Sequence, residues 1–298
     1  MLPEEGGNIR AMPLPPPPGA LIVGLPLLAL ALATFAGTYA LARYGPAADA
    51  IDKALFSAKA KPKRDGWKDG MREGARDVAT TAERRYGVAS RIVAELHNWV
   101  GIALGVSALG DAKLWADPLF AQNDATRCLI PWTTAYFIFD TVLVGYHVRA
   151  EGLGFLAHAV GCLFVYGNAL VTGTHHIFGA AFVTWEISTF FLHVRWLLKE
   201  MGHDSGKLYA LNGVVLFVVF VLVRNVGGTY ASVAYWRATA PLLASAAARR
   251  DAISVPTLWA YRVANVVLNA LNALWSYKMF RGVASRFFGR AKARSKTR

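Results

Sequence analysis

The sequence predicts an all-α membrane protein with several transmembrane helices. Hydrophobic residues make up 55% of the 298 residues and charged residues only 17%, whereas soluble domains carry about 25% charged residues. The apolar residues form seven long runs that are separated by shorter polar connections. This alternation is typical of a chain that crosses a bilayer repeatedly.

The N-terminal region divides into two parts. Residues 1–19 are rich in Pro and Gly, so we expect a disordered or extended segment. The next run, 20–42, has about 23 residues and is long enough to span the hydrocarbon core. A cleavable signal peptide has a charged start and a shorter apolar core. We therefore predict that 20–42 is a retained transmembrane anchor.

Residues 43–89 are predicted to form a basic cytoplasmic connector. The stretch 43–91 contains twelve Lys or Arg residues and seven acidic ones. Short loops rich in Lys and Arg stay on the cytoplasmic side of a membrane. Its middle is read either as a short amphipathic helix or, preferably, as a solvated connector, because charges of both signs are mixed along it.

Six further spans are expected between residues 90 and 284, which we interpret as one domain. The predicted spans are 92–110, 129–148, 153–171, 177–198, 208–232 and 256–281. The short connections favour antiparallel neighbours in a compact bundle. No internal repeat indicates a transporter built from two related halves.

The basic residues predict the orientation of the chain. Seven spans place the two termini on opposite sides of the membrane. With the connector in the cytoplasm, the basic tail 285–298 is cytoplasmic and the N-terminus is lumenal or extracellular, which satisfies the positive-inside rule. The tail ends in Arg294-Ser295-Lys296-Thr297-Arg298, similar to a basic retrieval signal, so we predict the endoplasmic reticulum or another endomembrane.

Composition and motifs exclude several function classes. The net charge of +13 makes nucleic acid a candidate partner. The basic residues, however, flank the spans, where they set the orientation of the chain in the membrane and contact anionic headgroups. We expect no nucleic-acid partner. The histidines are too scattered for a metal site, and we expect the adjacent His175-His176 pair at a surface or interface. Nucleotide-binding, zinc-protease and hydrolase motifs are missing, so we expect no metal or cofactor.

Ionisable residues inside the predicted spans are the main functional signal. Each costs roughly 2.5–3.5 kcal/mol at the centre of a membrane helix, so each needs a reason. Glu186, Thr189 and His193 share one helical face, as do Tyr136 and Asp140. We interpret these residues as facing a shared interior, with interhelical hydrogen bonding or a buried ion pair as the structural alternative.

A stripe of asparagines in the last span follows the same logic. Asn265, Asn269 and Asn272 lie on one helical face and cannot point at hydrocarbon without a large desolvation cost. Either they bond to neighbouring helices or they line a cavity. The residues expected to line a cavity or bind lipid are Tyr136, Asp140, His158, Glu186, Thr189, His193, Arg224, Asn265, Asn269 and Asn272.

Small residues in the second span predict a close helix contact. Gly101 and Gly105 form a G-x-x-x-G pattern, which lets two helix backbones approach each other closely. In a packed bundle, we expect the partner helix to belong to the same chain. The oligomeric state stays open.

Three segments of the predicted spans stand out: residues 186–196, which read EISTFFLHVRW, the dipeptide Phe139-Asp140, and residues 271–279, which read LNALWSYKM. The first is similar to the E-x-S-T-x-F-x-x-x-R-W segment of the small TLC-domain proteins, and the other two support the match. The stretch from about 90 to 284 thus resembles a TLC domain, the membrane fold shared by ceramide synthases and the translocating-chain-associated membrane protein. The resemblance implies six helices around a central cavity, preceded here by one N-terminal anchor.

The resemblance also implies two alternative functions for this protein. Ceramide synthases carry an adjacent His pair and two Asp residues, whereas this chain has Ala157-His158 and, at the acidic positions, Glu186 and Thr189. We therefore favour a non-synthase protein that binds, senses or regulates membrane lipids, either sphingolipids or glycerophospholipids. The alternative is an acyl-CoA-dependent lipid N- or O-acyltransferase with His158 as base, oriented by Glu186 or Asp140.

Overall fold

A computed structural model of the chain describes residues 19–56, 81–249 and 253–295, and all regular structure in them is helical. Except for Gly19, the Pro-rich segment 1–19 lies outside the described residues, as do the middle of the predicted connector and the end of the tail. The predicted all-α class is confirmed.

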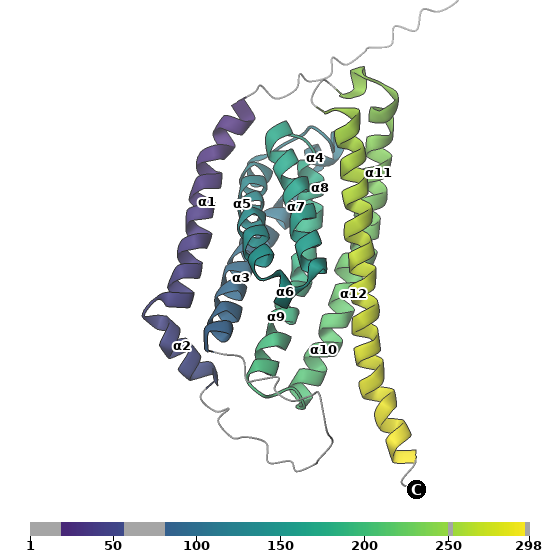
Figure 1. Cartoon of the computed structure of the whole chain (residues 1–298). Coiled ribbons are helices and arrows are strands. Elements are labelled where there is room, and N and C mark those ends of the chain that lie inside the picture. The colour runs from purple at the N-terminus through teal and green to yellow at the C-terminus, as the bar shows by residue number, and fades with distance from the viewer. Residues whose placement is uncertain (1–18, 57–80, 250–252, 296–298) are drawn as a thin grey trace, which may run out of the picture.

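The helices follow one another with short connections (Figure 1). Those of the N-terminal half are α1 (Gly19–Tyr44), α2 (Ala47–Phe56), α3 (Thr81–Leu109), α4 (Ala112–Ala116), α5 (Asp124–Tyr146), α6 (Val148–Glu151) and α7 (Leu153–Thr172). Those of the C-terminal half are α8 (His176–Val183), the 3₁₀ turn η2 (Thr184–Glu186), α9 (Ile187–Glu200), α10 (Lys207–Phe220), the π-helix η3 (Val221–Gly227), α11 (Gly228–Ala244), the 3₁₀ turn η4 (Ala247–Arg249) and α12 (Val255–Ser295).

Six helical segments of the described residues are long and apolar enough to cross a membrane. They are Gly24–Tyr44, Thr81–Leu109, Asp124–Tyr146, Leu153–Thr172, His176–Glu200 and Lys207–Ala244. Each overlaps one of the first six predicted spans, although Thr81–Leu109 begins earlier and Lys207–Ala244 ends later than predicted, and the protein is a multi-pass membrane protein. The seventh predicted span, 256–281, lies in α12, where three asparagines and Arg262 lower the mean hydropathy below that of the others.

The region read as a connector contains more helix than expected. It includes α2 and the first turns of α3, which begins at Thr81 rather than near residue 92. Ion pairs join the two helices, from Arg84 to Asp52 at 3.1 Å and from Arg85 to Asp49. Hydropathy detects only the apolar part of a helix, so it missed these charged turns.

The N-terminal anchor is part of the bundle. In Figure 1, α1 lies along one side of the molecule and α10, α11 and α12 along the other, with α5, α7 and α8 between them. The Phe35 ring of α1 is fully buried, 4.6 Å from the Trp132 ring and 5.8 Å from the Tyr136 ring. We call the end of the bundle that carries α2 and α6 the α2 end, and the opposite one the α4 end.

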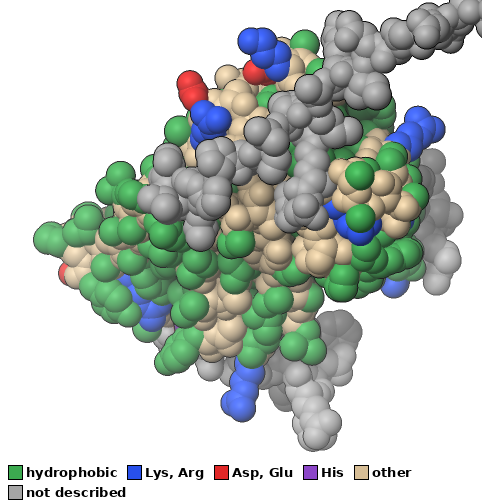
Figure 2. Space-filling model, turned by 90° about the horizontal axis from the view of Figure 1, so that it is seen from above, with side chains coloured by type: hydrophobic (Ala, Val, Ile, Leu, Met, Phe, Trp, Pro, Cys, Tyr) green, Lys and Arg blue, Asp and Glu red, His purple; other side chains and the backbone are tan. Residues whose placement is uncertain are grey.

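The outer surface suits a lipid environment. Figure 2 looks onto the α4 end of the bundle and shows hydrophobic side chains around its outline, with a few charged ones among them. Large apolar side chains such as Leu30, Val142 and Leu222 are exposed on the helices that could span the membrane. Such exposure is costly in water but neutral in hydrocarbon, so the same side chains support the membrane assignment.

The G-x-x-x-G pattern makes the expected contact within the chain. Gly101 and Gly105 both face Val183 of α8, and Gly105 also faces the Ala180 backbone. Because neither glycine has a side chain, α3 and α8 approach closely along this line. The contact fixes the position of α8, which carries part of the site described next.

Candidate functional site

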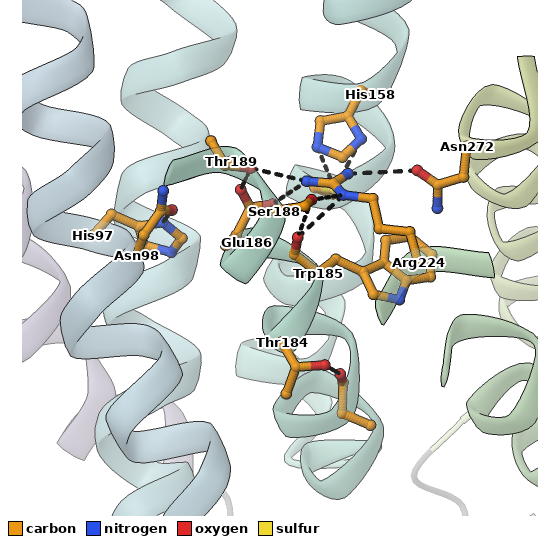
Figure 3. A network of polar contacts seen from close by, with 12 residues as sticks. His97, Asn98, His158, Thr184, Trp185, Glu186, Ser188, Thr189, Arg224 and Asn272 are labelled. Carbon is orange, nitrogen blue, oxygen red and sulfur yellow. Dashed lines mark hydrogen bonds and ion pairs between the residues drawn. The ribbon is translucent and has the colours of Figure 1, made fainter. Parts of the chain in front are cut away.

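A buried arginine organises a polar cluster in the middle of the bundle. Arg224 is only 5% exposed, and its guanidinium contacts four side chains and one backbone carbonyl (Figure 3). It donates to the partners Glu186 Oε1 at 3.4 Å, Thr189 Oγ1 at 3.0 Å, Ser188 Oγ at 2.9 Å, the Trp185 carbonyl at 3.1 Å and Asn272 Oδ1 at 3.4 Å. The cluster therefore joins the α8–α9 span, the α10–α11 span and α12.

Two departures from α-helical geometry create this cluster. Arg224 lies in the π-helix η3, and Glu186 ends the 3₁₀ turn η2. Changes of helical pitch leave backbone carbonyls outside the regular bonding pattern, and they are frequent at functional sites. Here the Trp185 carbonyl accepts hydrogen bonds from both Ser188 and Arg224.

The Glu186 carboxylate is fully engaged within the cluster. One oxygen faces Arg224, and the other accepts a 2.6 Å hydrogen bond from the Thr189 hydroxyl. A buried charge is tolerated when it is paired and its remaining lone pairs are bonded. Glu186 and Thr189 thus lie on one helical face, as predicted, and their side chains are in direct contact.

A narrow cavity extends from Glu186 toward the α4 end. Its volume is about 40 Å³, and one water molecule needs roughly 10–15 Å³ on this measure. Its lining is mostly aliphatic and aromatic, and it includes polar side chains from α7, the connection before α8, α11 and α12, namely His158, Tyr166, His175, Tyr235, Tyr261 and Asn265. At 1.5 Å per residue, Glu186 and His175 are separated by roughly 16 Å along α8 and η2.

His158 lines the cavity but does not form the expected acid–base arrangement. Its ring nitrogens lie 3.7 and 3.9 Å from Cys162 Sγ, and its ring packs edge-on against Phe137 and Trp275. Among the described residues, no hydrogen bond joins it to Glu186 or to Asp140. Asp140 itself is half-buried on α5 and does not line the cavity.

Two other predicted residues make contacts elsewhere in the bundle. The Tyr136 ring stacks on the His97 ring at 4.0 Å, between α5 and α3. His193 forms a 2.6 Å contact with Glu95, which joins α9 to α3 nearer the α2 end. Neither residue lines the cavity.

The asparagines of α12 are divided between the cluster and a groove. Asn272 bonds to Arg224, whereas Asn265 and Asn269 each donate to Ser232 Oγ at 3.0 Å. These last two line an open groove of about 590 Å³ between α11 and α12. Asn265 lines both the groove and the cavity, so it lies between the two spaces.

The adjacent histidines are buried, so the prediction of a surface or interfacial position is wrong. His175 is 3% exposed and His176 is 5% exposed. The connection folds inward because the His175 backbone N–H donates to the Leu119 carbonyl at 2.8 Å and its ring stacks on Tyr261 at 4.4 Å. No group of three or more possible metal ligands converges there or elsewhere in the described part of the chain.

Comparisons with known proteins assign the family. The family model of the TLC domain matches residues 88–281. An uncharacterised TLC domain-containing protein of Schizosaccharomyces pombe is 29% identical over 212 residues, which are 68% of each chain. TLC domain-containing protein 4-B of Danio rerio is 26% identical over 69% of this chain and 76% of its own length.

A protein of Saccharomyces cerevisiae, named topoisomerase I damage affected protein 4, is 28% identical over 50% of this chain and 52% of its own. No solved structure matches the chain. The family model covers well over half of the sequence, and the resemblance carried by residues 186–196 is confirmed. The chain is a multi-pass membrane protein that belongs to the TLC-domain family.

Proposed function

We propose that this protein binds membrane lipids in the groove and the adjoining cavity, and that it senses or regulates membrane composition through this binding. One observation carries the proposal. A groove lined by apolar side chains and by Ser232, Arg237, Asn265 and Asn269 adjoins a largely apolar cavity inside the bundle, and Asn265 lines both.

The two spaces suit different parts of a lipid. The groove is open and has Val233, Ala240 and Val266 in its walls, so it suits an acyl chain that remains continuous with the bilayer. Its lining also contains Ser232 and Asn269, which suit ester or amide groups. The cavity holds only a few water-sized groups, so it suits a small terminal group of a lipid rather than an acyl chain.

The structure favours binding over acyl transfer as the proposed activity. An acyltransferase needs a base close to an orienting carboxylate. Here Glu186 is occupied by Arg224 and Thr189, and His158 contacts Cys162 instead.

Blocking the groove should remove bound lipid. We expect Val266→Trp to lower several-fold the amount of lipid that remains bound after gentle purification. The large indole ring at this position would fill the groove that the acyl chain of the lipid occupies. Mass spectrometry of the extracted lipid measures the effect. Val263→Trp is the matched control, since both valines are exposed on α12, at 59% and 54%, and only Val266 lines the groove.

Equal lipid retention by the two variants would contradict the proposed site. The acyltransferase alternative has its own assay, in which the purified protein receives an acyl-CoA and a panel of lipid amines and alcohols. Product that forms with the unmodified protein and disappears in His158→Ala would replace the binding proposal with catalysis.

We also propose that the protein resides in an endomembrane and that its α2 end faces the cytoplasm. The basic residues of 43–91 and of the tail support this orientation. An N-terminally tagged chain that lacks the last five residues should shift from the endoplasmic reticulum to later membranes. Fluorescence microscopy against the full-length chain measures the shift, and an unchanged distribution would rule out retrieval by the tail.

A further inference from the structure

The α4 end of the cavity contains a chain of hydrogen bonds whose direction is fixed by chemistry. The Thr172 hydroxyl donates to the Asn168 carbonyl at 2.7 Å, because a carbonyl only accepts. The 2.7 Å contact between the Thr172 and Thr174 hydroxyls then uses the proton of Thr174. The 2.7 Å contact of Thr174 with His175 Nδ1 therefore uses the proton of the imidazole.

This order determines which nitrogen of His175 is free. With its proton on Nδ1, the neutral imidazole has a bare lone pair on Nε2. Burial, together with neighbouring His176, lowers the pKa of His175 to about 3, so the ring is neutral at cellular pH. Nε2 is buried and has no hydrogen-bond partner among the described residues. It is an acceptor that needs a donor.

A second unpartnered group lies on the same cavity wall. The Tyr235 hydroxyl is also buried and without a hydrogen-bond partner in the described part of the chain. The rings of His175 and Tyr235 are 5.8 Å apart, and both residues line the cavity. Buried polar groups normally form hydrogen bonds. Two unpartnered polar groups on one small cavity therefore indicate a bound ligand.

The backbone at His175 has an uncommon conformation, which indicates that the orientation of its ring is held by the surrounding structure. Its φ of 64° is the only positive φ of a non-glycine residue in the described ranges. L-residues adopt this left-handed conformation at a cost, and surrounding contacts must hold it. Here the bond to the Leu119 carbonyl and the stack on Tyr261 do so, and they direct the ring into the bundle.

We propose that this end of the cavity binds the hydroxyl group of a neutral lipid alcohol. The guest hydroxyl donates to His175 Nε2 and accepts from the Tyr235 hydroxyl. A carboxylate has no proton for Nε2, and an ammonium, which could donate to both atoms, leaves the Tyr235 proton without an acceptor. The inference rests on the proposed lipid binding and names its ligand class, with the groove beside Asn265 as the way in.

The direct test compares an alcohol with its ether. Full-length protein in detergent is titrated with a diacylglycerol and, separately, with the same lipid carrying a methyl ether in place of the hydroxyl, and native mass spectrometry gives both affinities. We expect the alcohol to bind about tenfold more tightly, because the ether leaves Nε2 without a donor.

Variants assign the preference to the two side chains. Tyr235→Phe should weaken alcohol binding about fivefold without lowering the melting temperature, because its hydroxyl has no hydrogen-bond partner to lose among the described residues. His175→Asn, a residue that tolerates the left-handed conformation, should abolish the preference for the alcohol. Tyr230→Phe is the control, since Tyr230 is 75% exposed on the same helix as Tyr235 and does not line the cavity, and it should leave the preference intact.

The outcomes separate this inference from the function on which it rests. Equal affinity for alcohol and ether would mean that water satisfies the two groups, which overturns the inference and leaves lipid binding in place. Binding of neither lipid, together with no lipid retained on purification, would overturn both. A preference that survives in both Tyr235→Phe and His175→Asn would locate the hydroxyl elsewhere and also overturn the inference.

Discussion

Glu186→Leu is expected to destabilise the fold by about 3–5 kcal/mol, because it leaves the Arg224 guanidinium buried without its counter-charge. Arg224 keeps its bonds to neutral oxygens, but none of these carries a compensating charge. The Thr189 hydroxyl loses its 2.6 Å acceptor at the same time. Thermal unfolding in mild detergent, followed by size-exclusion chromatography, measures the loss.

A double variant separates the charge from the packing. Replacing a whole buried ion pair by apolar residues is often neutral, whereas removal of one partner is not. Glu186→Leu combined with Arg224→Met should therefore be more stable than Glu186→Leu alone. His203→Ala is the control, because His203 is exposed in the connection between α9 and α10. Equal stability of Glu186→Leu and His203→Ala would contradict a buried, paired carboxylate.

The core of this cluster could be predicted from the sequence. An ionisable residue in an apolar run must find a polar partner, and helical periodicity places Glu186 and Thr189 on one face. Arg224 and Asn272 also lie in apolar runs and need polar partners, although periodicity does not determine which of the available partners each one contacts. The structure brings all four into one cluster.

Asp140 and Tyr136 illustrate where the argument from periodicity fails. It finds the polar face of a helix but not the neighbour that covers it. On α5, the Tyr136 ring lies 5.8 Å from the Phe35 ring of α1, and Phe139 packs against Tyr39 of α1 in the same way. The anchor, taken from sequence as a separate element, covers part of the face that we expected toward the cavity.

His175 and Tyr235 could not be found from hydropathy or spacing. A histidine in a short polar connection has no local signal of burial, and its position depends on contacts with Leu119 and Tyr261, distant in the sequence. Tyr235 lies on a span where an aromatic residue is unremarkable. Only the packed bundle places their unpartnered atoms on one cavity.

Gly105→Ala is the second change for which we expect a large effect, a loss of about 1–3 kcal/mol. An added Cβ at Gly105 would lie 2.5 Å from Val183 Cγ1 and 3.0 Å from the Ala180 carbonyl oxygen. Rotation of Val183 relieves the first contact but not the second, which is to backbone. The helices α3 and α8 must therefore separate, and Val183 and Glu186 of the cavity lining move with that span.

Gly167→Ala provides the matched control, because it is the same substitution inside another candidate span. Apart from the backbone of its own helix, no atom of the described residues lies within 4 Å of a Cβ built at Gly167, so only the helix propensity changes, and alanine gains about 1 kcal/mol over glycine there. Thermal unfolding should shift downward for Gly105→Ala and upward for Gly167→Ala. If Gly105→Ala also raised the melting temperature, α3 and α8 would not be in backbone contact, and the glycine pattern would have to serve a different helix.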